Sequence, residues 1–483
     1  MEIYSKQSKL KTVGLAASLI VVSAMAAFLI ARSDKLGLLF ICLIIGIAIA
    51  VISVINTFMG LQVSIVLGFV FADISRFTHG VIPFGLLIDV LLFLVFAGLV
   101  IKKRSRGEPM WSFCRHPIVY AYAVIFIYSM MQVVNPNGYG PASTIIILRR
   151  FVILQMYLYC CIQIFNLETF TRFLKFFIVL SVLAGLYGCI QEWFGYAQFE
   201  LDYINSDPKM AALYASDVGG DYRKFSSLTD PTAFGILMAA MAVLNIILIV
   251  TTKFNLQRFL LLAIGSMFLL MSMGYSGTRT AVAALAGGVA MYILMTLNNP
   301  KTLVFAALAF MGFVVIIYGP IYGNPTINRI RSTFEFNEDP SMDVRNVNRH
   351  RIQPYLQSHP FGGGLGTTGG EAGEVSLTSS HNHPLAGFPS DSGFLKMALE
   401  FGWIGLIIQL TAFFIVLQQG VHAYFASKRP EYKRYYLVAV IVLFCYMLAH
   451  YAQVAIGAIP GAFLFYAMIA GIVKLKQIEP TTL

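Results

Sequence analysis

Residues 231–250, PTAFGILMAAMAVLNIILIV, form 20 consecutive positions without an Asp, Glu, Lys or Arg. A helix of about 20 predominantly apolar residues is long enough to cross the hydrocarbon core of a bilayer. Similar runs recur along the chain, in which 58% of the 483 residues are hydrophobic and only 12% are charged. A water-soluble fold cannot bury that much apolar surface. The sequence therefore predicts an all-α protein that crosses a membrane many times.

The apolar runs predict a polytopic transmembrane helix bundle of about 12 to 14 spans, since each run of roughly 17 to 25 residues corresponds to one helix. The weakest run is the third, at 57–74, which is barely long enough and is also open to a re-entrant interpretation. The first run, 13–31, follows three lysines as a signal peptide does. Because no convincing cleavage site follows it, we expect a retained first helix.

The basic residues predict the orientation of the helices, because loops rich in Lys and Arg stay on the cytoplasmic side of a membrane. The formal charge of +11 arises mostly from such short loops, so no nucleic-acid partner is expected. With an even number of spans, both the N- and C-termini are cytoplasmic. The long segments 195–230 and 319–391 then lie on the outer face.

These features divide the chain into three expected regions. An N-terminal transmembrane bundle covers 1–194, and a catalytic region covers 195–418, including the large loop 319–391 between two late helices. C-terminal transmembrane helices follow at 419–483. The two outer segments and the short turns near them are where we expect the chemistry to lie.

Two arginines stand at points where an outer segment meets a helix. Arg223 precedes Thr229, Asp230 and Pro231, and either Thr229 or Asp230 suits the N-cap of the next helix, with Pro231 as its first residue. Arg223 has no comparable structural role, although a solvated cation or a lipid-phosphate anchor is an alternative. Arg279 lies in a connection so short that the side chain is at or just inside the membrane interface. An embedded arginine indicates a functional site unless it merely snorkels to the water.

The long outer loop carries a basic stretch followed by a glycine-rich turn. Arg345 and Arg349 would share one face of a helix, with a solvated basic face as the alternative. The glycines between Pro360 and Gly366 indicate a tight backbone turn. They do not form a Walker loop, because no Gly-Lys-Ser/Thr follows them.

The end of that loop contains residues able to titrate. His381 and His383 are spaced for metal chelation, but no third ligand at regular spacing accompanies them, so no metal site is expected. Asp391 precedes the next helix, and its alternative interpretation is an N-cap. Arginines near a carboxylate or an imidazole suit a reaction on a pyrophosphate-linked substrate. Guanidinium groups bind phosphate oxygens bidentately, while the carboxylate or imidazole removes a proton from an attacking sugar hydroxyl.

Four elements of this sequence, in their order and spacing, resemble the superfamily of O-antigen ligases and Wzy-type O-antigen polymerases, which are integral membrane glycosyltransferases. The elements are Arg223 before Asp230-Pro231, Ser276-x-x-Arg279, Arg345 before Pro360-x-Gly362-x-Gly364, and Glu400-x-Gly402-x-x-Gly405. The resemblance covers roughly residues 219–405, and the hydropathy matches on both sides.

The resemblance implies a GT-C-like bundle in a bacterial inner (cytoplasmic) membrane, with a periplasmic active site. The implied donor is an undecaprenyl-pyrophosphate-linked glycan, and the acceptor is a glycan or lipid A core, as in lipopolysaccharide or exopolysaccharide synthesis for the cell envelope. The transfer inverts the anomeric centre, needs no metal or other cofactor, and takes place among membrane lipids. Arg223, Arg279 and Arg345 then hold the pyrophosphate, and Arg279 also belongs to the catalytic set.

The residue that activates the acceptor is left between two candidates. Ligase-like members open the last helix of the site with His-Asn followed by an aromatic residue and Leu, whereas this chain has Asp391 in that place and His381 about ten residues earlier. Either His381 keeps the role across an insertion, or Asp391 replaces it, as in the polymerases. We favour Asp391 slightly.

A transporter or lipid flippase is the alternative function, because many helices and cavity-lining arginines suit it equally. Apart from Asp89, and a few charges near helix ends, the ionisable residues avoid the middle of the runs. An isolated carboxylate of this kind is more often paired structurally than a proton relay.

Overall fold

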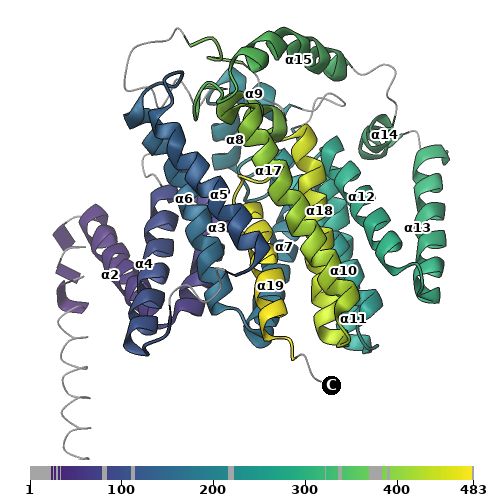
Figure 1. Ribbon diagram of the computed structural model, residues 1–483, viewed down its shortest axis with the longest axis horizontal. Helices are drawn as coiled ribbons and strands as arrows, with labels where there is room; N and C mark the ends of the chain where they lie inside the picture. The colour runs from purple at the N-terminus through teal and green to yellow at the C-terminus, as the bar shows by residue number, and fades with distance from the viewer. Residues whose placement is uncertain are drawn as a thin grey trace, which may run out of the picture.

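The computed structural model is built from helices (Figure 1). It describes residues 23–25, 27–28, 31–32, 34–78, 84–109, 115–215, 222–320, 323–334, 340–368, 383–388 and 392–480. Among these residues there is no named strand, and one isolated β-bridge joins Ala215 to Tyr222.

Twelve of the described helices are long and apolar enough to cross a membrane, which confirms the polytopic bundle. Their bounds are α3 Thr57–Phe77, α4 Phe84–Ser105, α5 Pro117–Met131 continued by η1 Gln132–Val134, α6 Pro141–Ile164, α7 Leu167–Phe194, α10 Pro231–Thr251, α11 Leu256–Tyr275, α12 Arg279–Thr296, α13 Pro300–Tyr318, α17 Gly393–Ala426, α18 Pro430–Ala452 and α19 Gly461–Ile478. The other helices are α2 Asp34–Ile55, α8 Gln198–Ile204, α9 Pro208–Tyr214, α14 Pro325–Ser332 and α15 Pro340–Ser358.

The third apolar run forms one continuous helix of 21 residues, α3, so it is long enough to span. Most of the first predicted span, 13–31, lies outside the described residues. Asp89 in α4 lies 3.1 Å from Arg149 in α6, measured from Oδ2 to Nε. This carboxylate is therefore paired with a cation of a neighbouring helix, as expected for a structural carboxylate rather than a proton relay.

The centre of the bundle is formed by α10, α18 and α19, in which 72% to 78% of the residues of the apolar window are buried. Helix α18 packs against α10, α12, α17 and α19. At the other extreme, only 6% of the corresponding window of α13 is buried, so this helix stands at the edge of the bundle. Segment 195–230 leads directly into the central helix α10, whereas segment 319–391 runs from the edge helix α13 to α17.

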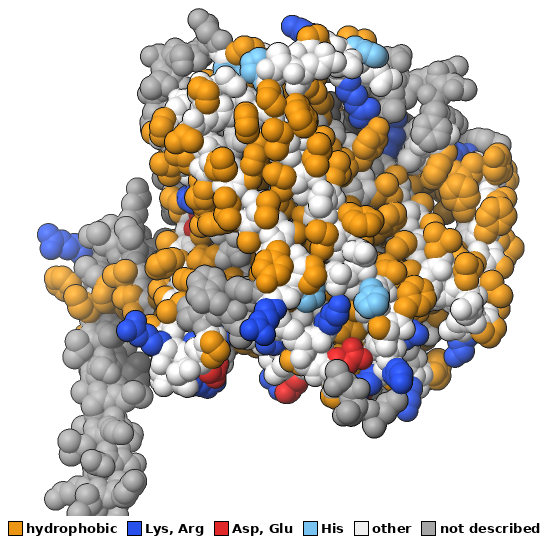
Figure 2. Space-filling model, in the orientation of Figure 1, with side chains coloured by type: hydrophobic (Ala, Val, Ile, Leu, Met, Phe, Trp, Pro, Cys, Tyr) orange, Lys and Arg blue, Asp and Glu red, His pale blue; other side chains and the backbone are white. Residues whose placement is uncertain are grey.

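The two ends of the bundle differ. Helices α8, α9, α14 and α15 lie at one end, and the C-terminus lies at the opposite end (Figure 1). Apolar side chains cover the middle of the visible face, while most of the Lys and Arg gather toward the ends (Figure 2). A membrane-spanning bundle has this distribution, because charges are costly within the hydrocarbon layer.

Candidate active site

The turn between α11 and α12, residues 276–278, is where predicted site residues meet. We call it the α11–α12 turn. Ser276 and Thr278 are buried, and Gly277 has a φ of +59°, a conformation that favours glycine. The hydroxyl of Thr278 donates to the carbonyl oxygen of Pro231 at 3.1 Å. The start of α10 is thereby joined to the α11–α12 turn.

Arg223 reaches the α11–α12 turn from the segment before α10. Its Nε donates to the carbonyl oxygen of Ser276 at 3.1 Å, and its Nη2 donates to the hydroxyl of Thr278 at 2.9 Å and, more weakly, of Thr232 at 3.4 Å. Its backbone N–H donates to the carbonyl oxygen of Tyr214 at 2.8 Å. Both the backbone and the guanidinium of Arg223 are thus held in place.

Arg279 directly follows the α11–α12 turn as the first residue of α12, and it is half-buried. At this position it lies at the helix end where unpaired backbone N–H groups favour anions. Two of the three arginines expected at the site, Arg223 and Arg279, therefore come together although they belong to separate connections of the bundle.

A further arginine, Arg329, lies at the same turn and was missed by the sequence interpretation. It belongs to α14, which packs against α11 and α12, and its Nε donates to the carbonyl oxygen of Gly277. The sequence signals only the start of its helix, because Asn324 caps α14 and Pro325 is its first residue.

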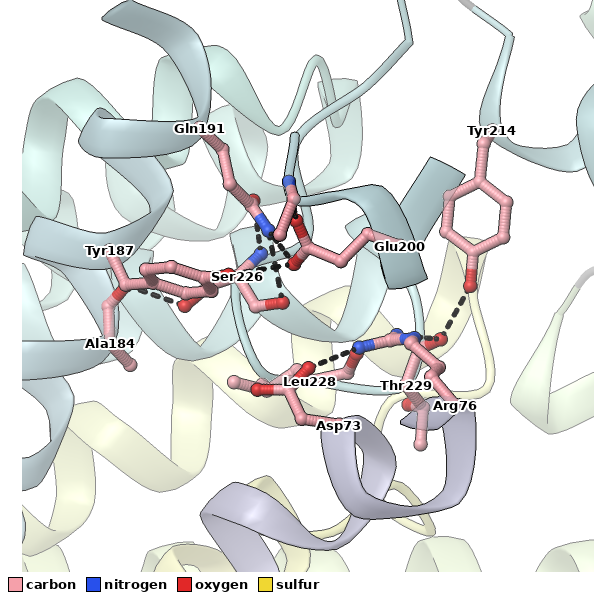
Figure 3. A network of polar contacts seen from close by, with 11 residues as sticks. Asp73, Arg76, Ala184, Tyr187, Gln191, Glu200, Tyr214, Ser226, Leu228 and Thr229 are labelled. Carbon is pink, nitrogen blue, oxygen red and sulfur yellow. Dashed lines mark hydrogen bonds and ion pairs between the residues drawn. The ribbon is translucent and has the colours of Figure 1, made fainter. Parts of the chain in front are cut away.

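The segment 222–230, which we call the Arg223 segment, is fixed by buried polar side chains of α3, α7 and α8 (Figure 3). Arg76, near the end of α3, is only 3% exposed and forms an ion pair with Asp73 at 2.8 Å. Its Nη2 donates to the carbonyl oxygen of Leu228 and, at 3.1 Å, to that of Thr229. A buried guanidinium with three such partners ties the Arg223 segment to a membrane-spanning helix.

The other side of the Arg223 segment is held by uncharged and acidic groups. Gln191 of α7 donates to Glu200 of α8 at 2.7 Å and accepts from the backbone N–H of Ser226 at 2.7 Å. The hydroxyl of Tyr214 donates to the carbonyl oxygen of Thr229 at 2.8 Å. Burial raises the pKa of Tyr214 to about 12, so this hydroxyl keeps its proton and remains a donor at neutral pH.

The glycine-rich turn 360–366 docks onto a kink in α17, and we call it the glycine turn. Gly402 interrupts the helical backbone of α17 with a φ of +74°. The carbonyl oxygen of Glu400, freed by this kink, accepts from the backbone N–H of Gly364 at 3.0 Å. A Cβ on Gly402 would overlap the carbonyl oxygen of Pro360. The glycines of the third family element, Pro360-x-Gly362-x-Gly364, therefore pack directly on the fourth, Glu400-x-Gly402-x-x-Gly405.

Amide side chains outside α17 complete that contact. Asn135 and Asn137 both donate to the carbonyl oxygen of Gly362, at 3.3 and 3.2 Å. The hydroxyl of Thr368 donates to the buried carboxylate of Glu400 at 2.6 Å. Glu400 thus accepts hydrogen bonds through both its backbone and its side chain. Within the part of the chain that the structure describes, these bonds fasten the glycine turn and the residues just after it to α17.

Residues 264–410 match the protein family described as O-antigen ligase. We call this matched segment the O-antigen ligase domain, after the family that it resembles. The match confirms the resemblance to the superfamily of O-antigen ligases and Wzy-type polymerases. No curated protein matches the chain.

The O-antigen ligase domain contains the α11–α12 turn, Arg279, α14, α15 and the kink at Gly402. Arg223 and the network around Arg76 lie before it in the sequence, and Arg223 touches it through Ser276 and Thr278. The matched residues fall inside the predicted catalytic region 195–418, whose boundaries stay a prediction.

Arg345 is part of α15, but its side chain lies outside the described residues, so its predicted contact with the pyrophosphate stays a prediction. Arg349, one turn later on the same helix, is described. Its guanidinium carbon lies 5.2 Å from the ring centroid of Tyr451, at the end of α18, and Nη1 donates to that hydroxyl at 3.4 Å. Helix α15 is thereby anchored above α18.

Asp391 and His381 both lie outside the described residues, so the choice between them stays open. The N-cap of α17 is Ser392, whose side chain accepts from the backbone N–H of Leu395 at 3.4 Å.

His383 is described, and both of its ring nitrogens bond to protein atoms. Nδ1 accepts from the backbone N–H of Leu385 at 3.1 Å, so the proton of the neutral ring is on Nε2, which donates to the carbonyl oxygen of Asn137 at 2.8 Å. This imidazole offers no nitrogen to a metal in the observed conformation.

Proposed function

We propose that this protein is a membrane glycosyltransferase that transfers an undecaprenyl-pyrophosphate-linked oligosaccharide or polysaccharide to an acceptor hydroxyl at the periplasmic face of a bacterial inner membrane. The product is an O-antigen or exopolysaccharide, either polymerised or ligated to lipid A core. Both termini are then cytoplasmic. The observation that carries the proposal is the meeting of Arg223 and Arg279 at the α11–α12 turn, within or against the O-antigen ligase domain.

The two arginines suit a departing pyrophosphate. During transfer, the acceptor oxygen bonds to the anomeric carbon as the bond from that carbon to the pyrophosphate oxygen breaks, and undecaprenyl pyrophosphate leaves with the electron pair. Negative charge therefore grows on the oxygen that the guanidinium groups face. Each charge-assisted hydrogen bond contributes about 1.5 to 3 kcal/mol. Positive charge fixed in advance by Ser276 and Thr278 stabilises that state without reorganisation.

The proton of the acceptor hydroxyl passes to a residue of the outer loop. Asp391 is our first candidate and His381 the second, and a carboxylate or a neutral imidazole performs this step equally well in chemical terms. Arg345 completes the pyrophosphate site in the proposal. The arginines take the place that a metal ion has in other glycosyl transfers, so the reaction is metal-independent.

The first test is substitution of the two described arginines in a strain that lacks the chromosomal copy. Arg279→Ala and Arg223→Ala should each lower the amount of polymer or ligated product by about 100-fold or more, the size of effect seen when a preorganised charge partner is removed. Arg258→Ala is the matched control, because Arg258 is exposed at the opposite end of α11 and should leave the product unchanged.

Membrane fractions should contain equal amounts of all three variants, as measured by immunoblot. Normal product from Arg279→Ala or Arg223→Ala would rule out the pyrophosphate site. In the deletion strain itself, accumulation of single lipid-linked repeat units indicates a polymerase, whereas accumulation of long lipid-linked chains indicates a ligase.

A further inference from the structure

Helix α14 is docked on the ends of α11 and α13 by side chains along its length. Near its start, Thr326 packs so closely on Gly274 that its Cγ2 would lie 2.9 Å from a Cβ added there. Near its end, Arg331 donates from Nε to the carbonyl oxygen of Ile316 at 2.9 Å, and from Nη2 to that of Gly319. α14 is therefore held between the end of α13 and the α11–α12 turn.

The two arginines of α14 occupy different surroundings. Arg331 is buried and binds carbonyl groups at the C-terminal end of α13, where a cation is favoured for structural reasons alone. Arg329 instead binds the carbonyl oxygen of Gly277 in the α11–α12 turn. The pair thus offers one structural arginine and one arginine at the candidate site, two residues apart.

Arg329 and Arg223 flank the same glycine. A Cβ placed on Gly277 would lie 3.0 Å from Nε of Arg329 and 3.6 Å from Cγ of Arg223. Arg279 begins α12 two residues later. Three arginines from three separate elements therefore meet at one turn, and the side chains of Arg223 and Arg329 both contact it.

The bond from Nε to Gly277 also fixes the plane of the Arg329 guanidinium. A guanidinium held in this way has lost most of its side-chain freedom before a ligand arrives, so less entropy is lost on binding. A pyrophosphate diester presents two phosphoryl groups, and each can accept a bidentate pair of hydrogen bonds. Several arginines at one turn suit a pyrophosphate diester better than they suit a single phosphate.

On the basis of the proposed function, we propose that Arg329 is an additional pyrophosphate-binding residue, contributed by α14 at the beginning of the long outer segment. Its contribution is specific for a ligand with two phosphoryl groups. The site then joins three connections of the bundle: the segment before α10, the α11–α12 turn and the segment after α13.

The test uses the full-length protein in lipid nanodiscs, with inorganic pyrophosphate and inorganic phosphate as probes. The apparent dissociation constant of each probe is obtained from the shift of the thermal unfolding midpoint on titration. Arg329→Gln should weaken pyrophosphate binding by about tenfold or more, the loss expected for a charge-assisted hydrogen bond, with a much smaller effect on phosphate. Arg329→Lys should lie between Gln and wild type, because lysine keeps the charge but not the planar fork.

Arg331→Gln is the matched control. It should lower the unfolding midpoint without ligand while leaving the preference for pyrophosphate over phosphate unchanged. If Arg329→Gln keeps the wild-type preference while Arg223→Gln and Arg279→Gln lose it, the role of Arg329 is refuted and the proposed function stands. If the wild-type protein binds neither probe and transfer survives all three substitutions, the proposed function fails as well.

Discussion

The Arg223 segment and the glycine turn are attached to the bundle by different chemistry. The Arg223 segment is held by buried side chains, above all by Arg76 with its ion-pair partner Asp73. The glycine turn is held mainly through its own backbone, by bonds such as that from the N–H of Gly364 to the carbonyl oxygen of Glu400, and the side chains of Asn135 and Asn137 add to this attachment. In the first case the fold depends on which side chains are present, and in the second it depends on the absence of a side chain.

This difference is related to what each segment does in the proposed reaction. The Arg223 segment must place a guanidinium with accuracy, and polar side chains with defined directions achieve that. The glycine turn carries no described charged ligand. It instead attaches the connection between α15 and α17 to the kink of α17, where the long outer segment returns to the bundle. The predictions below test this contrast.

The largest effect is expected from Gly402→Ala. The new Cβ would overlap the carbonyl oxygen of Pro360, and alanine disfavours the φ of +74°. The free energy of unfolding should fall by about 3 kcal/mol or more, seen as a lower thermal midpoint in detergent or nanodiscs. Gly312→Ala in α13 is the control, because a Cβ there meets nothing within 4 Å. Equal midpoints for the two variants would contradict backbone docking of the glycine turn.

The next largest effect should come from Arg76→Met. This change leaves the carboxylate of Asp73 without its cation and removes the donor to Leu228 and Thr229, at a cost of about 3 kcal/mol. Adding Asp73→Asn should restore part of the stability, since the unpaired charge is then gone. Arg172→Ala, which breaks an exposed ion pair with Glu168, should change the midpoint little.

A transfer assay shows whether Arg76 acts only on the stability of the fold or also on the position of the Arg223 segment. Arg76→Met together with Asp73→Asn should still transfer glycan poorly below its unfolding temperature, because the Arg223 segment has lost its tie to α3. Transfer at the wild-type rate in that double variant would mean that Arg76 only stabilises the fold.

The smallest effect is expected from Asp230→Ala. Asp230 caps α10 by accepting from the backbone N–H groups of Thr232 and Ala233 at 2.9 and 2.8 Å, and losing such a cap costs about 1 kcal/mol. Asn255→Ala removes the cap of α11 at the opposite end of the bundle. Both variants should unfold at slightly lower temperature, but only Asp230→Ala should slow transfer. If the two variants lose activity equally, the cap has no special link to the site.

The sequence predicts the bundle well because each apolar run must satisfy its own backbone within the membrane. The third run looked weakest because 57–74 is barely long enough, whereas α3 continues to Phe77 and includes the charged residues Asp73 and Arg76. Arg76 pairs with Asp73 and lies 4.2 Å from the ring centroid of Phe225, so its charge is directed into the protein and away from lipid. Local chemistry likewise limited the N-cap of α10 to Thr229 or Asp230, and the structure shows Asp230 in that role, with Pro231 as the first helical residue.

The site was predictable only in part. Arg223 and Arg279 could be proposed because each stands at a junction between a helix and an outer segment. Arg329 could not, since its importance depends on how α14 packs against the α11–α12 turn. The pairing of the glycine turn with Gly402 also joins residues far apart in the sequence, and no periodicity reports such a contact.

The most direct measurement of the central claim is transfer by the purified protein in nanodiscs, supplied with a lipid-linked glycan and an acceptor and with no ion gradient. Release of undecaprenyl pyrophosphate, followed by mass spectrometry, distinguishes glycosyl transfer from transport. We predict release by the wild-type protein and its loss in Arg279→Ala and Arg223→Ala. A donor that stays intact with the wild-type protein, but is moved across the membrane of a proteoliposome, would contradict the account.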